Sequence, residues 1–122
     1  MSKRILIVDD NLLFLKALNL LLSQEGFTVQ CSENAKSIDS IISGFKPDLI
    51  ILDIKLEDED GRIICNDIKE RPHTNHIPII IITALSFDEI SEMECEADAI
   101  LGKPYETANL LLTINQLLQQ TS

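Results

Sequence analysis

Tryptophan is missing from this chain, and aromatic residues of all kinds make up only 4% of it. A hydrophobic core must therefore rest on aliphatic side chains, chiefly Ile and Leu. Basic residues are also scarce, because ten Lys and Arg stand against twenty Asp and Glu and leave a net charge of -10. Binding to nucleic acid requires a basic face that neutralises phosphates, so this balance argues against direct contact with DNA or RNA.

Long hydrophobic runs are missing too. The longest, IPIIIITAL, is far shorter than the ~20 residues that a membrane-spanning helix needs. The first apolar run is only four residues long and ends in two acids, which makes it too short for the core of a signal peptide. We therefore expect a soluble, cytoplasmic protein that does not enter a membrane.

Cysteines are few. Cys31, Cys65 and Cys95 are odd in number, and no two of them have C-x-x-C spacing. This pattern indicates free thiols in a reducing compartment rather than a disulfide framework or a zinc site.

The 122 residues, 45% of them hydrophobic, are enough to bury a core without disulfides or a structural metal, and we expect residues 1–122 to form a single domain. Five short apolar runs are the expected strands: Ile5–Val8, Phe27–Cys31, Leu49–Ile54, Ile79–Thr83 and Ala99–Leu101. Five segments of helical length alternate with them: Asn11–Gln24, Asn34–Gly44, Gly61–Glu70, Phe87–Glu94 and Glu106–Gln119. Three of the runs are rich in Ile or Val without polar alternation, which is typical of strands buried on both faces of a parallel sheet. The alternation predicts a doubly wound α/β domain.

The first helical segment has two distinguishable sides. At 100° per residue, one face carries a set of apolar side chains, namely Phe14, Ala17, Leu18 and Leu21. Leu12 falls in the middle of the opposite, polar face, and Leu15 borders that face. We therefore expect Leu12 and Leu15 to lie on the outward side of the helix. In the last helical segment Leu112 is likewise outside the apolar stripe.

Charged or polar residues stand where four of the expected strands end. Asp9 and Asp10 follow the first strand, Asp53 lies at the end of the third, Thr83 ends the fourth, and Lys103 follows the fifth. Because ligands of open parallel sheets bind outside the carboxyl ends of the strands, these side chains are expected to converge there.

Three carboxylates at one place need a compensating positive charge. Two like charges about 4 Å apart repel by roughly 4 kcal/mol at an effective dielectric of 20. Lys103 supplies one positive charge. A hard divalent cation supplies the rest, and Mg²⁺ suits a site with few protein oxygens and several waters.

Four stretches together resemble the receiver domain of two-component response regulators over essentially the whole chain. They are ILIVDD, PDLIILDIKLEDEDG, IPIIIITA and ADAILGKPYE, in the order that the family shows. The resemblance implies a flavodoxin-like, five-stranded parallel sheet of order 2-1-3-4-5 with five helices, similar to the stand-alone chemotaxis regulators. It also implies that Asp53 accepts a phosphoryl group, that Thr83 is the switch hydroxyl and that Lys103 pairs with the phosphoryl group.

The same resemblance assigns the metal ligands. Asp10, Asp53 and the backbone carbonyl of Lys55 match the family's Mg²⁺ ligands, and Asp9 matches the acid that acts mostly through metal-bound water. A carboxylate is a nucleophile that can form an acyl phosphate. Transfer then needs mainly positioning and charge neutralisation, which Mg²⁺ and a lysine provide.

The resemblance also implies partners. The phosphoryl donor would be a histidine kinase or a histidine phosphotransfer protein, and Leu12 and Leu15 would pack against a helix of that partner. The phosphorylated chain would control a downstream protein target or relay phosphate to another histidine. We expect no output domain on this chain and no catalysis beyond its own phosphorylation and dephosphorylation.

Several positions depart from the family pattern. Glu57 stands where a Pro is frequent, Ile100 where a Tyr or Phe is usual, and Glu96 where a Gly is usual. The stretch from Thr83 to Lys103 is about two residues short. These departures predict a short fourth helix, no aromatic rotamer switch and little dimerisation through the face formed by the fourth helix, fifth strand and fifth helix.

Two further positions bear on the lifetime of an acyl phosphate. Lys55 and Leu85 stand two residues after Asp53 and Thr83, where the family tunes hydrolysis. Bulk beside the phosphoryl group hinders the in-line attack of water, so this pair predicts slow self-dephosphorylation.

Other readings of the sequence remain open. An adaptor that keeps only the fold would not need Asp53, Thr83 and Lys103. A phosphohydrolase with an aspartate nucleophile usually carries D-x-D, whereas this chain has Asp53-Ile54-Lys55. A flavodoxin-like nucleotide binder would need a Gly- or Ser/Thr-rich phosphate loop after the first strand. His73 and His76 lie in a Pro-flanked loop without a third metal ligand, and we interpret them as surface residues.

Overall fold

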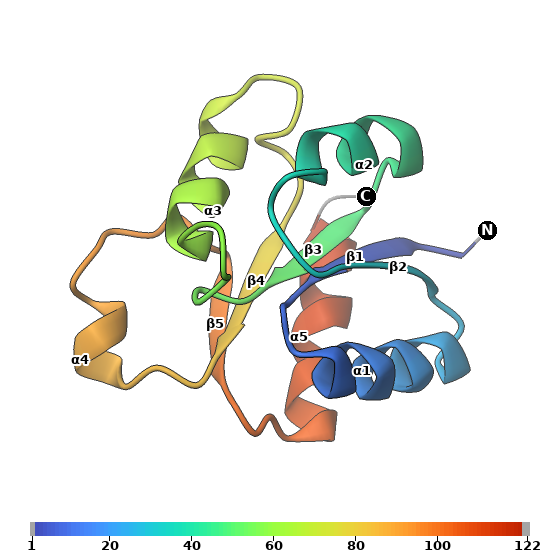
Figure 1. Cartoon of the computed structure of the whole chain (residues 1–122). Helices are drawn as coiled ribbons and strands as arrows, with labels where there is room; N and C mark the ends of the chain where they lie inside the picture. Colours follow the sequence, from blue (N-terminus) through green and yellow to red (C-terminus); the bar gives the residue numbers. More distant parts are fainter. Residues whose placement is uncertain (1, 121–122) are drawn as a thin grey trace.

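The computed structural model of the chain describes residues 2–120 and contains one five-stranded parallel sheet of order β2-β1-β3-β4-β5 (Figure 1). The strands are β1 (Arg4–Val8), β2 (Thr28–Ser32), β3 (Leu49–Leu52), β4 (Ile79–Thr83) and β5 (Ala99–Gly102). The helices are α1 (Leu12–Gln24), α2 (Ile38–Phe45), α3 (Gly61–Glu70), α4 (Phe87–Ile90) and α5 (Thr107–Gln120). The expected doubly wound fold, its strand order and its five helices are confirmed.

The most apolar strands occupy the middle of the sheet. All four residues of β3 and all five of β4 are buried, as is β1 after its first residue. The edge strands β2 and β5 instead alternate between more and less exposed positions. Continuous Ile-rich runs therefore mark strands that are covered on both faces, as the sequence predicts.

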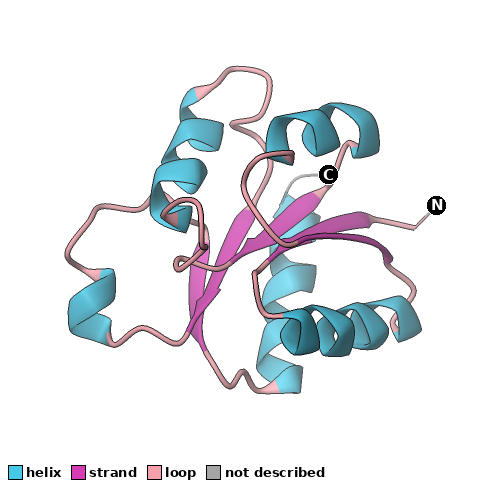
Figure 2. Ribbon diagram, in the orientation of Figure 1, coloured by secondary structure: helices cyan, strands magenta, loops and turns pink. Residues whose placement is uncertain are grey.

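Helices cover both faces of the sheet (Figure 2). Because successive side chains of a strand point to opposite faces, Ile5 and Ile7 of β1 pack with α1 and α5, while Leu6 and Val8 pack with α2 and α3. The two hydrophobic clusters that result hold the helices against the sheet. The loops at the carboxyl ends of the strands are thereby fixed on a rigid base.

The orientation of α1 differs from the sequence expectation at Leu15. Leu15 is only 4% exposed and belongs to the core with Leu18 and Leu22, whereas Ala17 is exposed. The expectation that Leu15 lies on the outward side is therefore wrong. Leucines occur on almost every side of this helix, so the sequence pattern does not fix the angle at which α1 meets the sheet. Leu12 is 53% exposed, as expected.

The last two helices follow the sequence pattern more closely. Leu110, Ile114 and Leu118 bury the inner face of α5, and Leu112 is exposed. The fourth helix is short, as expected, and ends at Ile90 rather than Glu94. Ser86 begins it with a capping box, in which the side chain of Glu89 accepts the N–H of Ser86 at 3.0 Å. Within residues 2–120, every helix is too short or too polar to cross a lipid bilayer.

Candidate functional site

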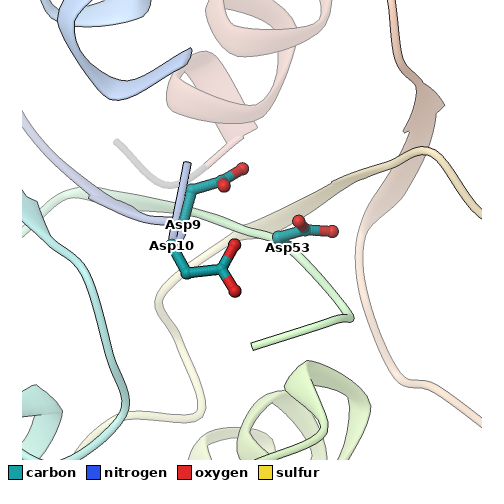
Figure 3. Close-up of side chains that lie close together, drawn as sticks. All are labelled: Asp9, Asp10 and Asp53. Carbon is teal, nitrogen blue, oxygen red and sulfur yellow. The ribbon is translucent and has the colours of Figure 1, made fainter. Parts of the chain in front are cut away.

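Three carboxylates meet at the carboxyl edge of the sheet. Asp9 and Asp10 follow β1, and Asp53 follows β3 (Figure 3). Each of the three offers one oxygen within 4.8 Å of the others. The convergence of these acids that the strand ends predict is thus present in the structure.

The register of the two central strands brings these residues together. Val8 of β1 pairs with Leu52 of β3, so the residues that follow, Asp9 and Asp53, leave the sheet side by side. The N–H of Asp53 donates to the carbonyl of Val8 at 3.0 Å, which continues the ladder into the site. Parallel pairing of adjacent strands therefore positions the carboxylates through the backbone.

Asp9 is held on both of its carboxylate oxygens. The N–H of Asn11 donates to Oδ1 at 2.9 Å, and Lys103 Nζ donates to Oδ2 at 2.7 Å. Asn11 also caps α1, because its side chain accepts the N–H of Phe14 at 3.1 Å. The start of the first helix is consequently tied to the acid at the end of the first strand.

Lys103 links two of the carboxylates. Its Nζ lies 2.7 Å from Oδ2 of Asp9 and 3.1 Å from Oδ2 of Asp53. The same ammonium lies 4.3 Å from the ring centroid of Phe14, and that ring packs edge-on against Tyr105. A cation over an aromatic face is favoured electrostatically, so Phe14 adds a stabilising contact to the ammonium that pairs with the acids.

Burial and charge together raise the pKa values of both Asp9 and Lys103. Burial raises the pKa of Asp9, and the hydrogen bond from Lys103 offsets this only in part. Burial lowers the pKa of Lys103, but its hydrogen bonds and attraction to Asp9 and Asp53 outweigh that effect and raise it. A raised pKa disfavours the ionised form of Asp9, which is more deeply buried than Lys103. The raised pKa of Lys103 favours its ionised form, because its one ammonium pairs with two carboxylates. Geometry and the Lys103 shift both indicate an ionised lysine.

Asp53 keeps one oxygen free of donors. Oδ2 accepts from Lys103, but no group within residues 2–120 donates a hydrogen bond to the buried Oδ1. A buried polar atom without a partner is unfavourable, and it indicates a place where a ligand completes the site. Like charges within 4.8 Å also repel by at least about 3 kcal/mol per pair at an effective dielectric near 20. The oxygen donors and their excess negative charge fit a divalent cation such as Mg²⁺.

Thr83 and Lys55 lie at the border of this cluster. Thr83 is buried, and its hydroxyl oxygen accepts the N–H of Leu85 at 3.2 Å. The carbonyl of Thr83 accepts the N–H of Lys103 at 2.8 Å, which joins the end of β4 to the segment that follows β5. Lys55 is exposed and lines a groove of about 440 Å³ together with Leu85. The two positions that the family resemblance links to lifetime therefore border one groove.

Gly61, which the sequence analysis did not assign to the site, lies against the backbone of Asp53. A Cβ built at Gly61 would lie 1.9 Å from the carbonyl oxygen of Asp53 and 3.0 Å from Cα of Ile54. The N–H of Gly61 also donates to the carbonyl of Ile54 at 2.7 Å. The first turn of α3 approaches the Asp53 loop so closely that only a residue without a side chain fits. The sequence shows only an Asp-Gly pair at the start of a helical segment, which does not indicate this close approach.

Arg62 was also missed, and it is a buried charge. Its guanidinium forms hydrogen bonds of 3.1 and 2.8 Å to Asp60 and of 2.9 and 3.0 Å to the carbonyls of Glu89 and Ile90. Asp60 in turn caps α3 by accepting the N–H of Arg62. Most of the acidic run from Glu57 is exposed, but its last acid is part of this network. The sequence gives no signal that an arginine would join α3 to α4.

The remaining candidates lie apart from the carboxylates. His73 and His76 are exposed and border a groove beside Lys46 and Asp48. Among the described residues, neither belongs to a group of three metal-ligating side chains. Ile100, where an aromatic residue was expected from the family pattern, is 42% exposed on the edge strand.

Comparison with known proteins agrees with this geometry. The family model described as the response regulator receiver domain matches residues 5–115. The chain is 33% identical over 119 residues to the response regulator PleD of Caulobacter vibrioides. That alignment covers 96% of this chain but only 26% of PleD, so the chain spans about a quarter of the length of this relative.

Solved structures share the fold over nearly the whole chain. The receiver domain of a signal transduction histidine kinase from Syntrophus aciditrophicus is 30% identical with a TM-score of 0.89, and 98% of this chain and 92% of that chain are covered. A CheY-like receiver domain protein from Methanospirillum hungatei is 28% identical with a TM-score of 0.88, and 99% and 97% of the two chains are covered. Sequence and three-dimensional similarity thus extend over the same residues.

Proposed function

Because the chain belongs to the response regulator receiver family, we propose that it is a phosphoacceptor signalling domain in which Asp53 receives a phosphoryl group from a phosphohistidine. Family membership makes the chain a signalling module rather than a conventional enzyme, and it implies a histidine kinase as partner. The observation that carries the proposal is the buried, unpartnered Oδ1 of Asp53 beside two further carboxylates and a lysine.

Asp53 is the nucleophile in this proposal. Oδ1 forms a bond to phosphorus while the bond between phosphorus and the imidazole nitrogen of the donor breaks, and that nitrogen keeps the electron pair. The product on this chain is an acyl phosphate. Lys103 already binds Oδ2 at 3.1 Å, which leaves Oδ1 as the attacking atom and places an ammonium beside the phosphoryl oxygens.

The acidic triad is typical of the Mg²⁺ site of receiver domains. We assign direct binding to Asp10, Asp53 and the backbone carbonyl of Lys55, and binding through water to Asp9. Asp9 suits the indirect role because its two oxygens are already engaged by Asn11 and Lys103. The bound ion supplies positive charge for the phosphoryl oxygens.

Thr83 is the proposed switch residue. Its hydroxyl oxygen accepts the N–H of Leu85, so the hydroxyl is coupled to the loop that leads into α4. New phosphoryl oxygens at Asp53 would attract the hydroxyl and draw this loop toward the site. The displaced loop and α4 would then alter the surface that a downstream protein target recognises, or the chain would relay its phosphate to another histidine.

The proposed contact with the histidine-bearing partner is near Leu12. Leu12 is 53% exposed and lines a groove of about 470 Å³ with Lys16, Asn19 and the loop after β2. Leu15 reaches the same groove from the core side. A partner helix that packs on Leu12 would present its phosphohistidine next to the acids, because α1 starts two residues after Asp10.

Incubation with acetyl phosphate and Mg²⁺ tests the function. We expect one phosphoryl group per chain by intact mass, none in Asp53→Asn and none in excess EDTA. Asp53→Asn keeps the size of the side chain, and circular dichroism would verify its fold. If the folded wild-type chain takes up no phosphate from acetyl phosphate or a phosphorylated histidine phosphotransfer protein, the chain is an adaptor on the receiver fold and the proposal is wrong.

A further inference from the structure

Two cysteines lie together on the side of α3 that faces the segment before β5. Cys65 is in α3 and is fully buried, whereas Cys95, in the segment between α4 and β5, is half-buried. Cys95 packs against the hydrophobic cluster that contains Cys65. Figure 1 shows this segment running from α4 past α3 before it enters the sheet. The pair is separate from the carboxylate site.

A side chain next to Cys65 fixes the backbone on both sides of Cys95. Nδ2 of Asn66 donates to the carbonyl of Glu94 at 2.8 Å, and the N–H of Glu96 donates to Oδ1 of Asn66 at 2.8 Å. Both hydrogen bonds come from one amide group on α3. They hold the backbone that carries Cys95 beside the helix, so the thiols remain neighbours while the fold is intact.

The surroundings make the two sulfurs unequal. Interaction with the Cys65 thiol lowers the pKa of Cys95 to about 6, and the N–H of Ala97 and the positive charge of Arg62 act in the same direction. The interaction with Cys95, together with burial, raises the pKa of Cys65. The half-buried sulfur of Cys95 is therefore the one that a peroxide can reach, and the fully buried sulfur of Cys65 is shielded from it.

We propose that Cys95 is a site of oxidation by peroxides and that Cys65 resolves the oxidised sulfur into a disulfide within the chain. The Cys95 thiolate attacks one oxygen of the peroxide, which forms a sulfenic acid as the O–O bond breaks and releases water or an alcohol. The sulfur of Cys65 then attacks the sulfenic sulfur, loses its proton, and displaces water. Two thiols lose two protons and two electrons in total, and the peroxide accepts them.

The cross-link would join two elements that are otherwise held by hydrogen bonds. The Asn66 side chain of α3 forms hydrogen bonds to the segment around Cys95, and the Arg62 side chain of α3 forms hydrogen bonds to the end of α4. A disulfide would add a covalent bond along the same contact. Backbone amides of residues 91–98 should therefore exchange hydrogen more slowly in the oxidised protein.

Treatment of the full chain with hydrogen peroxide, followed by denaturation, alkylation and peptide mapping without reductant, tests the proposal. We expect a peptide pair joined through Cys65 and Cys95 and a free thiol at Cys31. Cys31 is a matched internal control because it lies on the other face of the sheet and burial raises its pKa. Alkylation of native protein at neutral pH should be at least ~10-fold faster at Cys95 than at Cys31.

Variants separate the two roles. Cys65→Ala should stop at a sulfenic acid on Cys95 that dimedone traps, and Cys95→Ser should form no cross-link. Cys31→Ser should behave as wild type. Because Cys65 is buried and its replacement can unfold the protein, the peptide map of the wild-type protein is the measurement that decides between the outcomes. Oxidation of Cys31 first, or of Cys95 to sulfinic acid with Cys65 left as a thiol, would overturn the proposal, whether or not Asp53 accepts phosphate.

Discussion

Replacement of Gly61 by alanine is a direct probe of how α3 supports Asp53. The new Cβ would lie 1.9 Å from the carbonyl oxygen of Asp53, whereas ordinary carbon–oxygen contacts begin at about 3.3 Å. The separation must therefore grow by more than about 1 Å. The N–H of Gly61 is hydrogen-bonded to Ile54 at 2.7 Å, so the two backbones cannot separate without weakening that bond.

The expected loss of stability follows from two opposing effects. Overpacking of this kind costs about 1–3 kcal/mol. Alanine favours helical backbone over glycine by up to about 1 kcal/mol, less at the first position of a helix than in its interior. We expect a net loss of about 1.5 kcal/mol, out of the 5–15 kcal/mol typical of a domain. With a urea m-value of about 2 kcal/mol/M, the unfolding midpoint should fall by about 0.75 M.

The substitution should lower the rate of phosphorylation more strongly than it lowers the stability of the fold. A displacement of about 1 Å at a reacting group can slow a reaction about 100-fold. Labelling of Gly61→Ala by acetyl phosphate should therefore be slowed by a factor between about 10 and 100 under conditions in which the protein is folded. Gly44→Ala is the matched control, because Gly44 lies in α2 with no atom within 4 Å of its Cβ position. That variant should label normally and be as stable as wild type or slightly more so. If Gly61→Ala matches the control in both measurements, the close approach does not position Asp53.

Three other predictions concern the charges and surfaces around the site. Lys103 has a raised pKa in the folded state, so its ion pairs contribute their full stabilisation below the ordinary lysine pKa. Urea titrations should show that this part of the unfolding free energy is lost as the pH rises through the raised pKa. Lys103→Met should lack that alkaline step, and an unchanged step would assign it to another group. Lys55→Asn with Leu85→Glu should shorten the lifetime of the acyl phosphate several-fold, measured by loss of phosphate from purified protein; equal decay would show that the groove they line does not control hydrolysis. Leu12→Ala should slow transfer from the histidine-bearing partner without slowing acetyl phosphate labelling, whereas Leu13→Ala, at the neighbouring leucine that is 79% exposed, should slow neither; if Leu12→Ala slows both donors, Leu12 serves the fold.

The sequence predicts the sheet well because strands that are buried on both faces are continuous apolar runs without polar alternation. Ile79–Thr83 reads as a strand without alternation, and it is a central strand with every residue buried. The carboxylate site is also predictable, since acids that follow adjacent parallel strands must share one edge of the sheet. Asp9 and Asp53 satisfy this rule through the pairing of Val8 with Leu52.

Other features depend on packing that the sequence pattern does not encode. Leu15 was expected at the surface because it borders the polar face of the helical segment, but α1 carries leucines on most sides and only its docking on the sheet decides which of them are buried. Arg62 is buried because backbone carbonyls of α4 accept its hydrogen bonds, and carbonyl positions cannot be inferred from residue types. The role of Gly61 likewise depends on the distance between two backbone segments.

The most direct test of the account is chemical identification of the residue that carries the phosphoryl group. An acyl phosphate on an aspartate is reduced by borohydride to homoserine, which peptide sequencing by mass spectrometry locates without any substitution. After labelling with acetyl phosphate and Mg²⁺, we expect homoserine at position 53 alone. Homoserine at position 9 or 10, or phosphate on a residue that borohydride does not reduce, would show that Asp53 is not the phosphoacceptor.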